Sequence, residues 1–291
     1  MRKSKIGLAP RPGAAKGCAH KAAINALMQV GIKSDIKAGC SAGARVGAAY
    51  ACDQLTSRES WGRAFRYRNA WLLMNAFRQC AGPLREARVF NQLHLLASLA
   101  SVGAIKRFGT AAENLSIEGE FWLKKRDLHM AVRSPCSMPG ALASALHNGY
   151  PLVDGAAVSP ISLTRAPGAD IVIADDLQHD AYLKQQKPLS EASLRGSLPD
   201  AGRRKLLRGL VTGRATLPST AMEIMRPSIQ VLENRVKRNR MAESPPDILL
   251  QPYCPQISTL DFHRAEEAIN AGTLTVDKRR DEFLPLVHVN D

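Results

Sequence analysis

Short apolar runs alternate with helix-like patterns through the first part of the chain. Residues 5–9 form an apolar run typical of a buried strand, and a loop of small residues, 10–17, follows it. Apolar positions at helical spacing predict a helix over 19–30. A second short strand at 35–40 and a small-residue helix at 42–52 come next. This order predicts a parallel sheet whose strands are joined by helical crossovers, which is an α/β fold.

The rest of the chain continues this alternation of strands and helices. The pattern over 58–108 is helical and amphipathic, with its large aromatic residues expected in the core or a cleft. The later expected elements are strands near 111–114 and 120–123, a helix near 127–134, a strand at 170–174, a helix at 224–241, a strand at 247–252 and a helix at 261–272. Residues 184–220 lack clear periodicity, which favours a mobile basic loop or lid. No repeat or strong linker interrupts the pattern, so residues 1–291 are predicted to form a single domain.

Charge is unevenly distributed along the chain. The formal net charge is +14, and residues 184–240 hold 13 Lys and Arg against 4 Asp and Glu. Such an excess favours anionic partners, which are a phospholipid surface or nucleic acid. No aromatic residue is interleaved with these charges, and this argues against nucleic acid. Peripheral contact with an anionic membrane and a simple solvated helical face stay open as alternatives.

Several classes of protein find no support in the composition. No run approaches the roughly 18 apolar residues of a membrane span, and Pro10 and Pro12 interrupt the segment behind the basic N-terminus. A cytoplasmic location is therefore expected. The six cysteines are scattered, which favours buried free thiols over disulfides. The seven histidines show no metal-binding spacing, so neither a metal nor another cofactor is expected.

The most informative chemical motif is Gly39-Cys40-Ser41-Ala42-Gly43, a G-x-S-x-G sequence between a predicted strand and a predicted helix. A serine at a sharp strand-to-helix turn presents its hydroxyl outward, and the flanking glycines let the backbone close. The N-terminus of the following helix favours negative charge that develops there. Ser41 is therefore the candidate nucleophile, and the alternative is that it merely caps the helix.

The small-residue loop Gly13-Ala14-Ala15-Lys16-Gly17 follows the first strand. In a parallel sheet this strand neighbours the strand before Ser41, so the backbone N–H groups of the loop are placed to face a substrate oxyanion. Pro12 has no N–H, and the donors must come from Gly13, Ala14 or beyond. The spacing of the glycines matches neither nucleotide-binding pattern, which argues against a phosphate cradle.

Together with Val153-Asp154-Gly155-Ala156, the loop at 13–17 and the motif at 39–43 occur in the order and spacing of patatin-like phospholipases. The chain resembles that family from Lys5 to about residue 180. Further likeness to its bacterial RssA-type members lies around 147–150, 229–240 and 252–263. Asp154 by itself also fits a tight Asp-Gly turn, but the three ordered motifs are more specific than any one of them.

The resemblance implies a fold, a reaction and a set of site residues. The implied fold is a three-layer α/β/α sandwich around a mainly parallel sheet. The implied reaction is hydrolysis of lipid or other carboxylic esters by a Ser-Asp dyad without histidine. Ser41 would attack the ester carbonyl and Asp154 would act as base, while Gly13, Ala14 and Lys16 would stabilise the oxyanion. An acyl-enzyme on Ser41 would then be hydrolysed by water.

Other polar residues are expected to have structural roles. Ser137 is expected to lie near the cleft as a structural residue. The histidines considered as alternatives to the dyad are expected in the core, in loops or on the surface, and they are His20, His147, His179 and His263.

The chain departs from the family pattern at four positions. Arg11 and Pro12 stand where relatives usually carry glycine or serine, Asp175 replaces an apolar residue at the end of a strand, and Pro167 falls in the expected helix before that strand. If Arg11 and Pro12 distort the loop, replacing them with glycine and serine is expected to raise turnover. A non-catalytic regulatory protein that binds lipid or a protein partner is the alternative that the departure at Arg11 and Pro12 favours.

Overall fold

The computed structural model describes residues 4–53, 55, 108–123, 128–137, 144–156, 158–177, 221–257 and 261–288. The chain divides into two compact units, Met1–His179 with Glu233–Asp291, and Asp180–Leu232. The sheet and the candidate site belong to the first unit. The helices expected between 58 and 107 and the lid expected at 184–220 lie outside the described residues. The single-domain organisation stays a prediction.

Within the described residues, eight strands form one mixed sheet in the order β5-β6-β3-β2-β1-β7-β8, with β4 paired to β3. Their bounds are β1 Ile6–Pro10, β2 Ile36–Gly39, β3 Phe108–Asn114, β4 Gly119–Leu123, β5 Ala145–His147, β6 Tyr150–Asp154, β7 Ile171–Asp175 and β8 Ile248–Leu250. The run β3-β2-β1-β7-β8 is parallel throughout, and β4, β5 and β6 add antiparallel pairs. The predicted α/β class with a mainly parallel sheet is confirmed.

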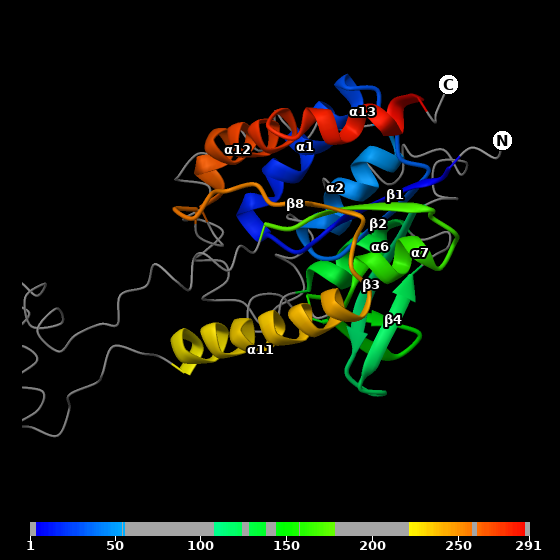
Figure 1. Cartoon of the computed structure of the whole chain (residues 1–291). Coiled ribbons are helices and arrows are strands. Elements are labelled where there is room, and N and C mark those ends of the chain that lie inside the picture. Colours follow the sequence, from blue (N-terminus) through cyan, green and yellow to red (C-terminus); the bar gives the residue numbers. More distant parts are fainter. Residues whose placement is uncertain are drawn as a thin grey trace, which may run out of the picture. The chain divides into compact units, whose positions relative to one another are not determined.

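Helices cover both faces of this sheet (Figure 1). Residues of α1, α2, α12 and α13 pack on one face, while α7 and the C-terminal part of α11 pack on the other. The helix bounds are η1 Ala14–Lys16, α1 Gly17–Gln29, α2 Ala42–Ala51, α6 Leu128–Arg133, η3 Ser134–Cys136, α7 Pro160–Arg165, α11 Ala221–Glu243, η4 Phe262–Arg264, α12 Ala265–Asp277 and α13 Arg280–His288. The three layers implied by the family resemblance are therefore present.

Strand β1 shows why an unbroken apolar run sits in the middle of the sheet. All five of its residues are buried. Side chains alternate along a strand, so Ile6 and Leu8 join the cluster under α1, and Ala9 packs with Ile161 of α7 on the opposite face. A strand covered on both sides needs apolar residues at every position, which is the pattern of a central parallel strand.

Four details differ from the sequence-based expectations. Phe108 begins β3 instead of ending a helix, and β5 and α13 are elements that the pattern did not reveal. Pro167 lies in the turn after α7, which ends at Arg165, so it interrupts no helix. The expected cost of an interior proline is therefore absent.

Candidate active site

Strand β3 brings two distant parts of the chain together. The last residue of β2, Gly39, pairs with Thr110 in parallel register. Two residues further along β3, Ala112 pairs with Asp154, the last residue of β6. Strands β2 and β6 therefore both end beside the same part of β3. Ser41, two residues after β2, reaches Asp154 because of this register.

The structure brings together the side chains of Ser41 and Asp154, the two residues of the predicted dyad. The Ser41 hydroxyl donates a hydrogen bond to Oδ2 of Asp154, with an oxygen-to-oxygen distance of 2.7 Å. Both side chains are buried. The backbone N–H of Asp154 donates to the carbonyl of Ser137 at 3.0 Å, and the Ser137 hydroxyl donates to the carbonyl of Arg133. Ser137 thus has the structural position expected for it, because it holds the backbone of Asp154.

The backbone at Ser41 has the strained geometry of a sharp turn. Its φ is 52° and its ψ is −122°, a region that residues other than glycine rarely adopt. A Cβ on Gly39 would lie 2.5 Å from the backbone of Gly43, and a Cβ on Gly43 would lie 2.1 Å from the carbonyl oxygen of Pro10. Both glycines are therefore required by close backbone contacts at this turn.

The surroundings of Asp154 favour the protonated form of its carboxyl. Burial raises the pKa of its carboxyl from 3.8 to about 8, against the opposing effect of the hydrogen bond from Ser41. The negative charges of Glu233 and Glu113 raise this pKa further, and Arg45 lowers it. A base that titrates near neutral pH is well matched to proton transfer under ordinary conditions. No sequence motif connects these three charged residues with Asp154, because each lies on a different element.

The loop after β1 packs beside the turn at Ser41. Residues Ala14–Lys16 form η1, which contacts α2, and a Cβ on Gly17 would lie 3.0 Å from Cβ of Ala42. Ala14 has a φ of 47°, and the N–H of Lys16 donates to the carbonyl of Gly13. The half-buried Lys16 side chain lies where its charge lowers the pKa of the Cys254 thiol, although burial of that thiol raises its pKa more.

Three of the four histidines considered above, His20, His147 and His263, have surroundings that match the structural roles expected for them. His20 is fully buried, and its Nε2 donates to the carbonyl of Arg11 at 2.7 Å. The ring of His147 packs against Phe121, with their centroids 5.3 Å apart, and His263 is exposed. His179 lies outside the described residues.

A buried charged cluster near the dyad was largely missed from the sequence. It consists of Arg11, His20, Asp175, Asp176 and Lys237. Two of its members, Arg11 and Asp175, stand out in the sequence as departures from the family pattern, but no motif connects them. The partners of Asp175 and Asp176, which are Arg11, His20 and Lys237, lie between 61 and 165 residues away along the chain, so sequence spacing does not reveal the pairing.

Three further properties concern only the residues that the structure describes. No helix among them is both long and apolar enough to cross a membrane. No group of three or more His, Cys, Asp or Glu side chains among them is placed to hold a metal ion. No disulfide joins the described cysteines, which are Cys18, Cys40, Cys52, Cys136 and Cys254, and Cys40 and Cys254 are buried.

Comparison with known proteins places the chain among distant relatives. No family model matches it. Uncharacterised NTE family proteins of Mycobacterium bovis and of two strains of Mycobacterium tuberculosis, CDC 1551 and H37Rv, are each 24% identical over 331 aligned residues. The alignments span 96% of this chain and 92% of each relative. The chain is similar to NTE family proteins over nearly its whole length.

A solved structure also resembles the chain. It is the crystal structure of VipD from Legionella pneumophila, with a TM-score of 0.48 and 11% sequence identity. The match covers 97% of this chain and 67% of the VipD chain.

Proposed function

We propose that this chain is a serine hydrolase that cleaves carboxylic esters, and lipid esters in particular, through a Ser41-Asp154 dyad. The observation that carries the proposal is the 2.7 Å contact between the Ser41 hydroxyl and the Asp154 carboxyl, at a strained turn between a strand and a helix. Similarity to NTE family proteins and the patatin-like motifs support a lipid acyl hydrolase.

The proposed reaction uses groups of this chain in every step. Asp154 accepts the proton of the Ser41 hydroxyl as Oγ attacks the ester carbonyl. The oxyanion that forms faces backbone N–H groups of Gly13 and Ala14, with Lys16 nearby. When the tetrahedral intermediate collapses, the ester C–O bond breaks and the leaving alkoxide takes the proton from Asp154. Water, deprotonated by Asp154, then attacks the acyl-Ser41 ester. The bond between the acyl carbon and Oγ breaks, Ser41 takes the proton back from Asp154, and the carboxylic acid leaves.

The position of His20 supports a dyad over a triad. A carbonyl oxygen only accepts hydrogen bonds, so Nε2 of His20 donates to Arg11, and Nδ1 lies 2.8 Å from Oδ2 of Asp175. Both ring nitrogens therefore face other groups. Among the described histidines, His20 is the one nearest in sequence to Ser41, and its ring is engaged elsewhere.

Hydrolysis of short p-nitrophenyl esters tests the dyad. Ser41→Ala and Asp154→Asn are expected to lose most of the activity while remaining folded, because each removes one partner of the proton transfer. Ser34→Ala is the matched control, since Ser34 precedes the same strand that Ser41 follows. His20, His147, His179 and His263 variants that fold are expected to stay active. A folded Ser41→Ala protein with unchanged activity would overturn the proposal.

The alternative function is a non-catalytic protein of the same fold that binds lipid or a protein partner. This alternative is supported if the folded wild-type chain hydrolyses none of a panel of esters with short and long acyl chains. Comparing the wild type with Ser41→Ala on the same esters also distinguishes hydrolysis by this chain from hydrolysis by a contaminating esterase.

A further inference from the structure

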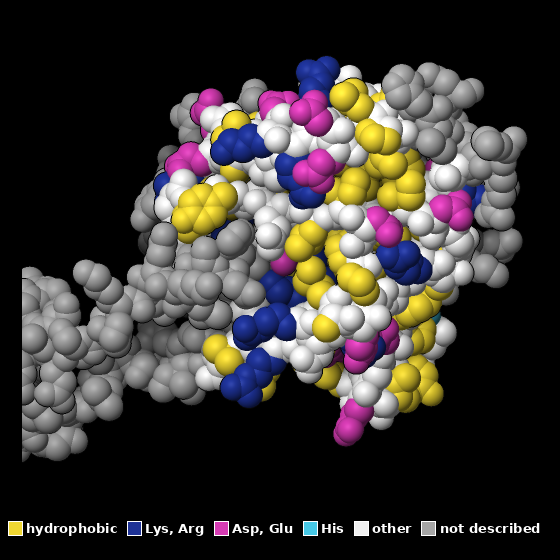
Figure 2. Space-filling model, in the orientation of Figure 1, with side chains coloured by type: hydrophobic (Ala, Val, Ile, Leu, Met, Phe, Trp, Pro, Cys, Tyr) yellow, Lys and Arg dark blue, Asp and Glu magenta, His cyan; other side chains and the backbone are white. Residues whose placement is uncertain are grey.

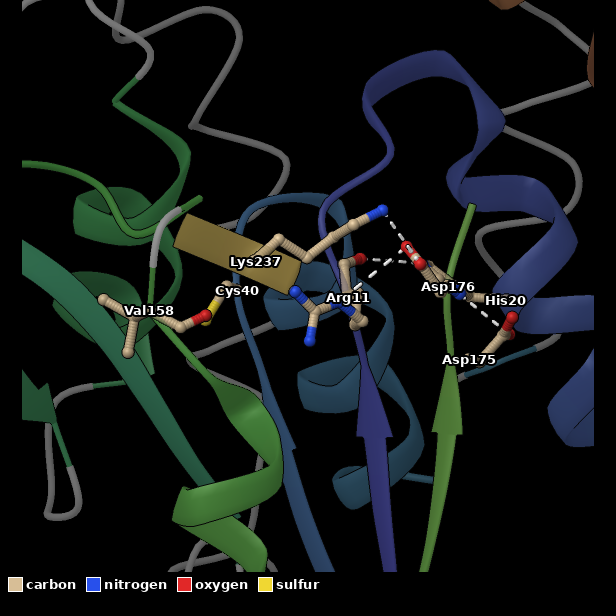
Figure 3. A network of polar contacts seen from close by, with 7 residues as sticks. All are labelled: Arg11, His20, Cys40, Val158, Asp175, Asp176 and Lys237. Carbon is tan, nitrogen blue, oxygen red and sulfur yellow. Dashed lines mark hydrogen bonds and ion pairs between the residues drawn. The ribbon is translucent and has the colours of Figure 1, made fainter. Parts of the chain in front are cut away.

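Five ionisable side chains are buried together where β1 and β7 end, next to the turn at Ser41. Figure 3 shows Arg11 between Cys40 and Asp176, with Lys237 pointing to Asp176 and His20 next to Asp175. Arg11 is 1% exposed and Lys237 is 3% exposed. Burying ionised groups costs free energy unless they are well paired, so the pairing within this cluster decides whether it stabilises the fold.

The charges in this cluster are paired across four elements of the fold. Asp176 follows β7, and its two oxygens meet Nε of Arg11 at 3.7 Å and Nζ of Lys237, from α11, at 3.1 Å. Asp175 is paired with His20, from α1, at 2.8 Å. The pairing connects the ends of β1 and β7 with the helices α1 and α11.

Stability alone does not account for Arg11. Burial lowers the pKa of its guanidinium, with the charge of Asp176 acting in the opposite direction. Its Nε and Nη1 are buried and have no hydrogen-bond partner among the described residues. A buried cation with unsatisfied donors destabilises a fold compared with an apolar side chain of similar size. We therefore expect Arg11 to act by fixing the geometry of the residues around it.

The backbone of Arg11 is held at both of its polar groups. Its N–H donates to the carbonyl of Asp175 at 2.9 Å, and its carbonyl accepts from Nε2 of His20 at 2.7 Å. The same carbonyl oxygen lies against the turn at Ser41, since a Cβ on Gly43 would be 2.9 Å from it. Arg11 therefore sits between the segment after β7 and the backbone that presents the nucleophile.

The next residues of the loop rest on the same segment. A Cβ on Gly13 would lie 2.4 Å from the side chain of Leu177, so the loop backbone is packed against the residue that follows Asp175 and Asp176. Ala14 then adopts its unfavourable positive φ. Such a conformation persists only where the surroundings hold it. The segment 175–177 thus forms a support for the loop that carries the candidate oxyanion donors.

We propose that Arg11, Asp176 and Lys237 are positioning residues that hold the oxyanion loop at a set distance from Ser41, with α11 as part of the clamp. The proposal rests on the hydrolase function proposed above. It also reverses the expectation drawn from the sequence alone, because Arg11→Gly would leave the buried Asp176 with one cation fewer and release the loop. Loss of turnover, not gain, is the expected result.

Turnover per active site separates positioning from folding. Sites are counted by titration with a fluorophosphonate probe, so unfolded molecules do not contribute to kcat. Arg11→Met is expected to lower kcat per titrated site by about tenfold or more, with a smaller change in KM, because oxyanion donors act mainly on the transition state. Arg11→Lys retains the cation and is expected to keep more of the turnover than Arg11→Met.

A matched control removes an ion pair elsewhere. Arg165 of α7 pairs with Asp247 at 3.2 Å, and Arg165→Met is expected to leave kcat per titrated site unchanged. If Arg11→Met lowers only the melting temperature and the number of titratable sites, its role is structural and the proposal is overturned. If Arg11→Met does not fold, Asp176→Asn decides by the same measurement. A wild-type chain that neither hydrolyses esters nor reacts with the probe contradicts the proposed function itself.

Discussion

The raised pKa of Asp154 predicts a pH dependence of activity that can be measured. Its pKa is raised to about 8, mainly by burial, and its ionised form is the proposed base. The kcat/KM for ester hydrolysis should therefore rise about tenfold per pH unit below this value and level off above it. Initial rates between pH 5.5 and 9.5 provide the test. A profile that is flat, or that falls as pH rises, would contradict the role of Asp154 as base.

The raised pKa of Asp154 should also make the stability of the folded chain depend on pH. The folded state keeps a proton on Asp154 between the ordinary pKa of 3.8 and the raised value of about 8, whereas the unfolded state has lost it. Ionisation therefore costs the folded state, and the contribution of Asp154 to stability declines as pH rises through this window. Asp154→Asn removes that decline, so its melting temperature relative to wild type should be higher at pH 8.5 than at pH 5. An equal difference at both pH values would refute the raised pKa.

At the scale of residues, Ser41, Asp154 and the two glycines could be recognised because their motifs are local. The partners of Asp154 could not be, because Glu113, Glu233 and Arg45 act through space from three elements. Arg11 and Asp175 depart from the family pattern in the sequence, but their contacts are visible only in the structure. Only the fold shows that Asp176 lies between Arg11 and Lys237.

At the scale of elements, the turn between β2 and α2 is the tightest part of the site. A methyl group on Gly43 would meet the backbone of Pro10 at 2.1 Å, where no flexible side chain can move aside. Gly43→Ala is expected to lower the free energy of unfolding by about 1–3 kcal/mol or more and to remove ester hydrolysis. Chemical denaturation and rate measurements check both effects.

Glycine 109 offers a matched control for this substitution. Gly109 lies in the neighbouring strand β3, and the nearest atom to its added Cβ is 4.0 Å away. Gly109→Ala is expected to have little effect on stability or rate. If the two variants lose stability equally, the close contact at Gly43 is not what limits substitution there.

Strong local patterns explain which elements were predictable. The strands β1 and β7 are continuous apolar runs, and the helices α1 and α12 have clear apolar spacing. Strand β5 has only three residues, too few for a pattern, and α13 contains Pro285, which disfavours a helix assignment. The register that brings β2 and β6 together on β3 has no sequence signal, because it depends on pairing between distant segments.

At the scale of the whole molecule, the net charge of +14 predicts attraction to anionic surfaces. Lys and Arg side chains gather over the C-terminal part of α11 (Figure 2), where Arg235, Arg238 and Arg240 are exposed. Binding to vesicles should rise with their anionic lipid content and weaken with salt, since charges are screened beyond about 10 Å at 0.1 M ionic strength. Vesicle co-sedimentation measures both trends.

Charge reversal locates the surface responsible. Arg235→Glu combined with Arg238→Glu should weaken vesicle binding more than Lys278→Glu combined with Arg280→Glu, which makes the same change in net charge at exposed positions near the C-terminus. Equal losses in the two variants would assign the effect to net charge alone. Equal binding of the wild type to neutral and anionic vesicles would overturn the membrane proposal, and tighter binding to DNA would favour nucleic acid.

Covalent labelling of Ser41 tests the central claim most directly. A fluorophosphonate reacts with a serine hydroxyl only when a base and a stabilised oxyanion activate it. We predict that the native chain is labelled once, that peptide mapping places the label on Ser41, and that labelling disappears in Ser41→Ala but not in Ser34→Ala. A native, folded chain that is not labelled, or that is labelled at another serine, would contradict the account.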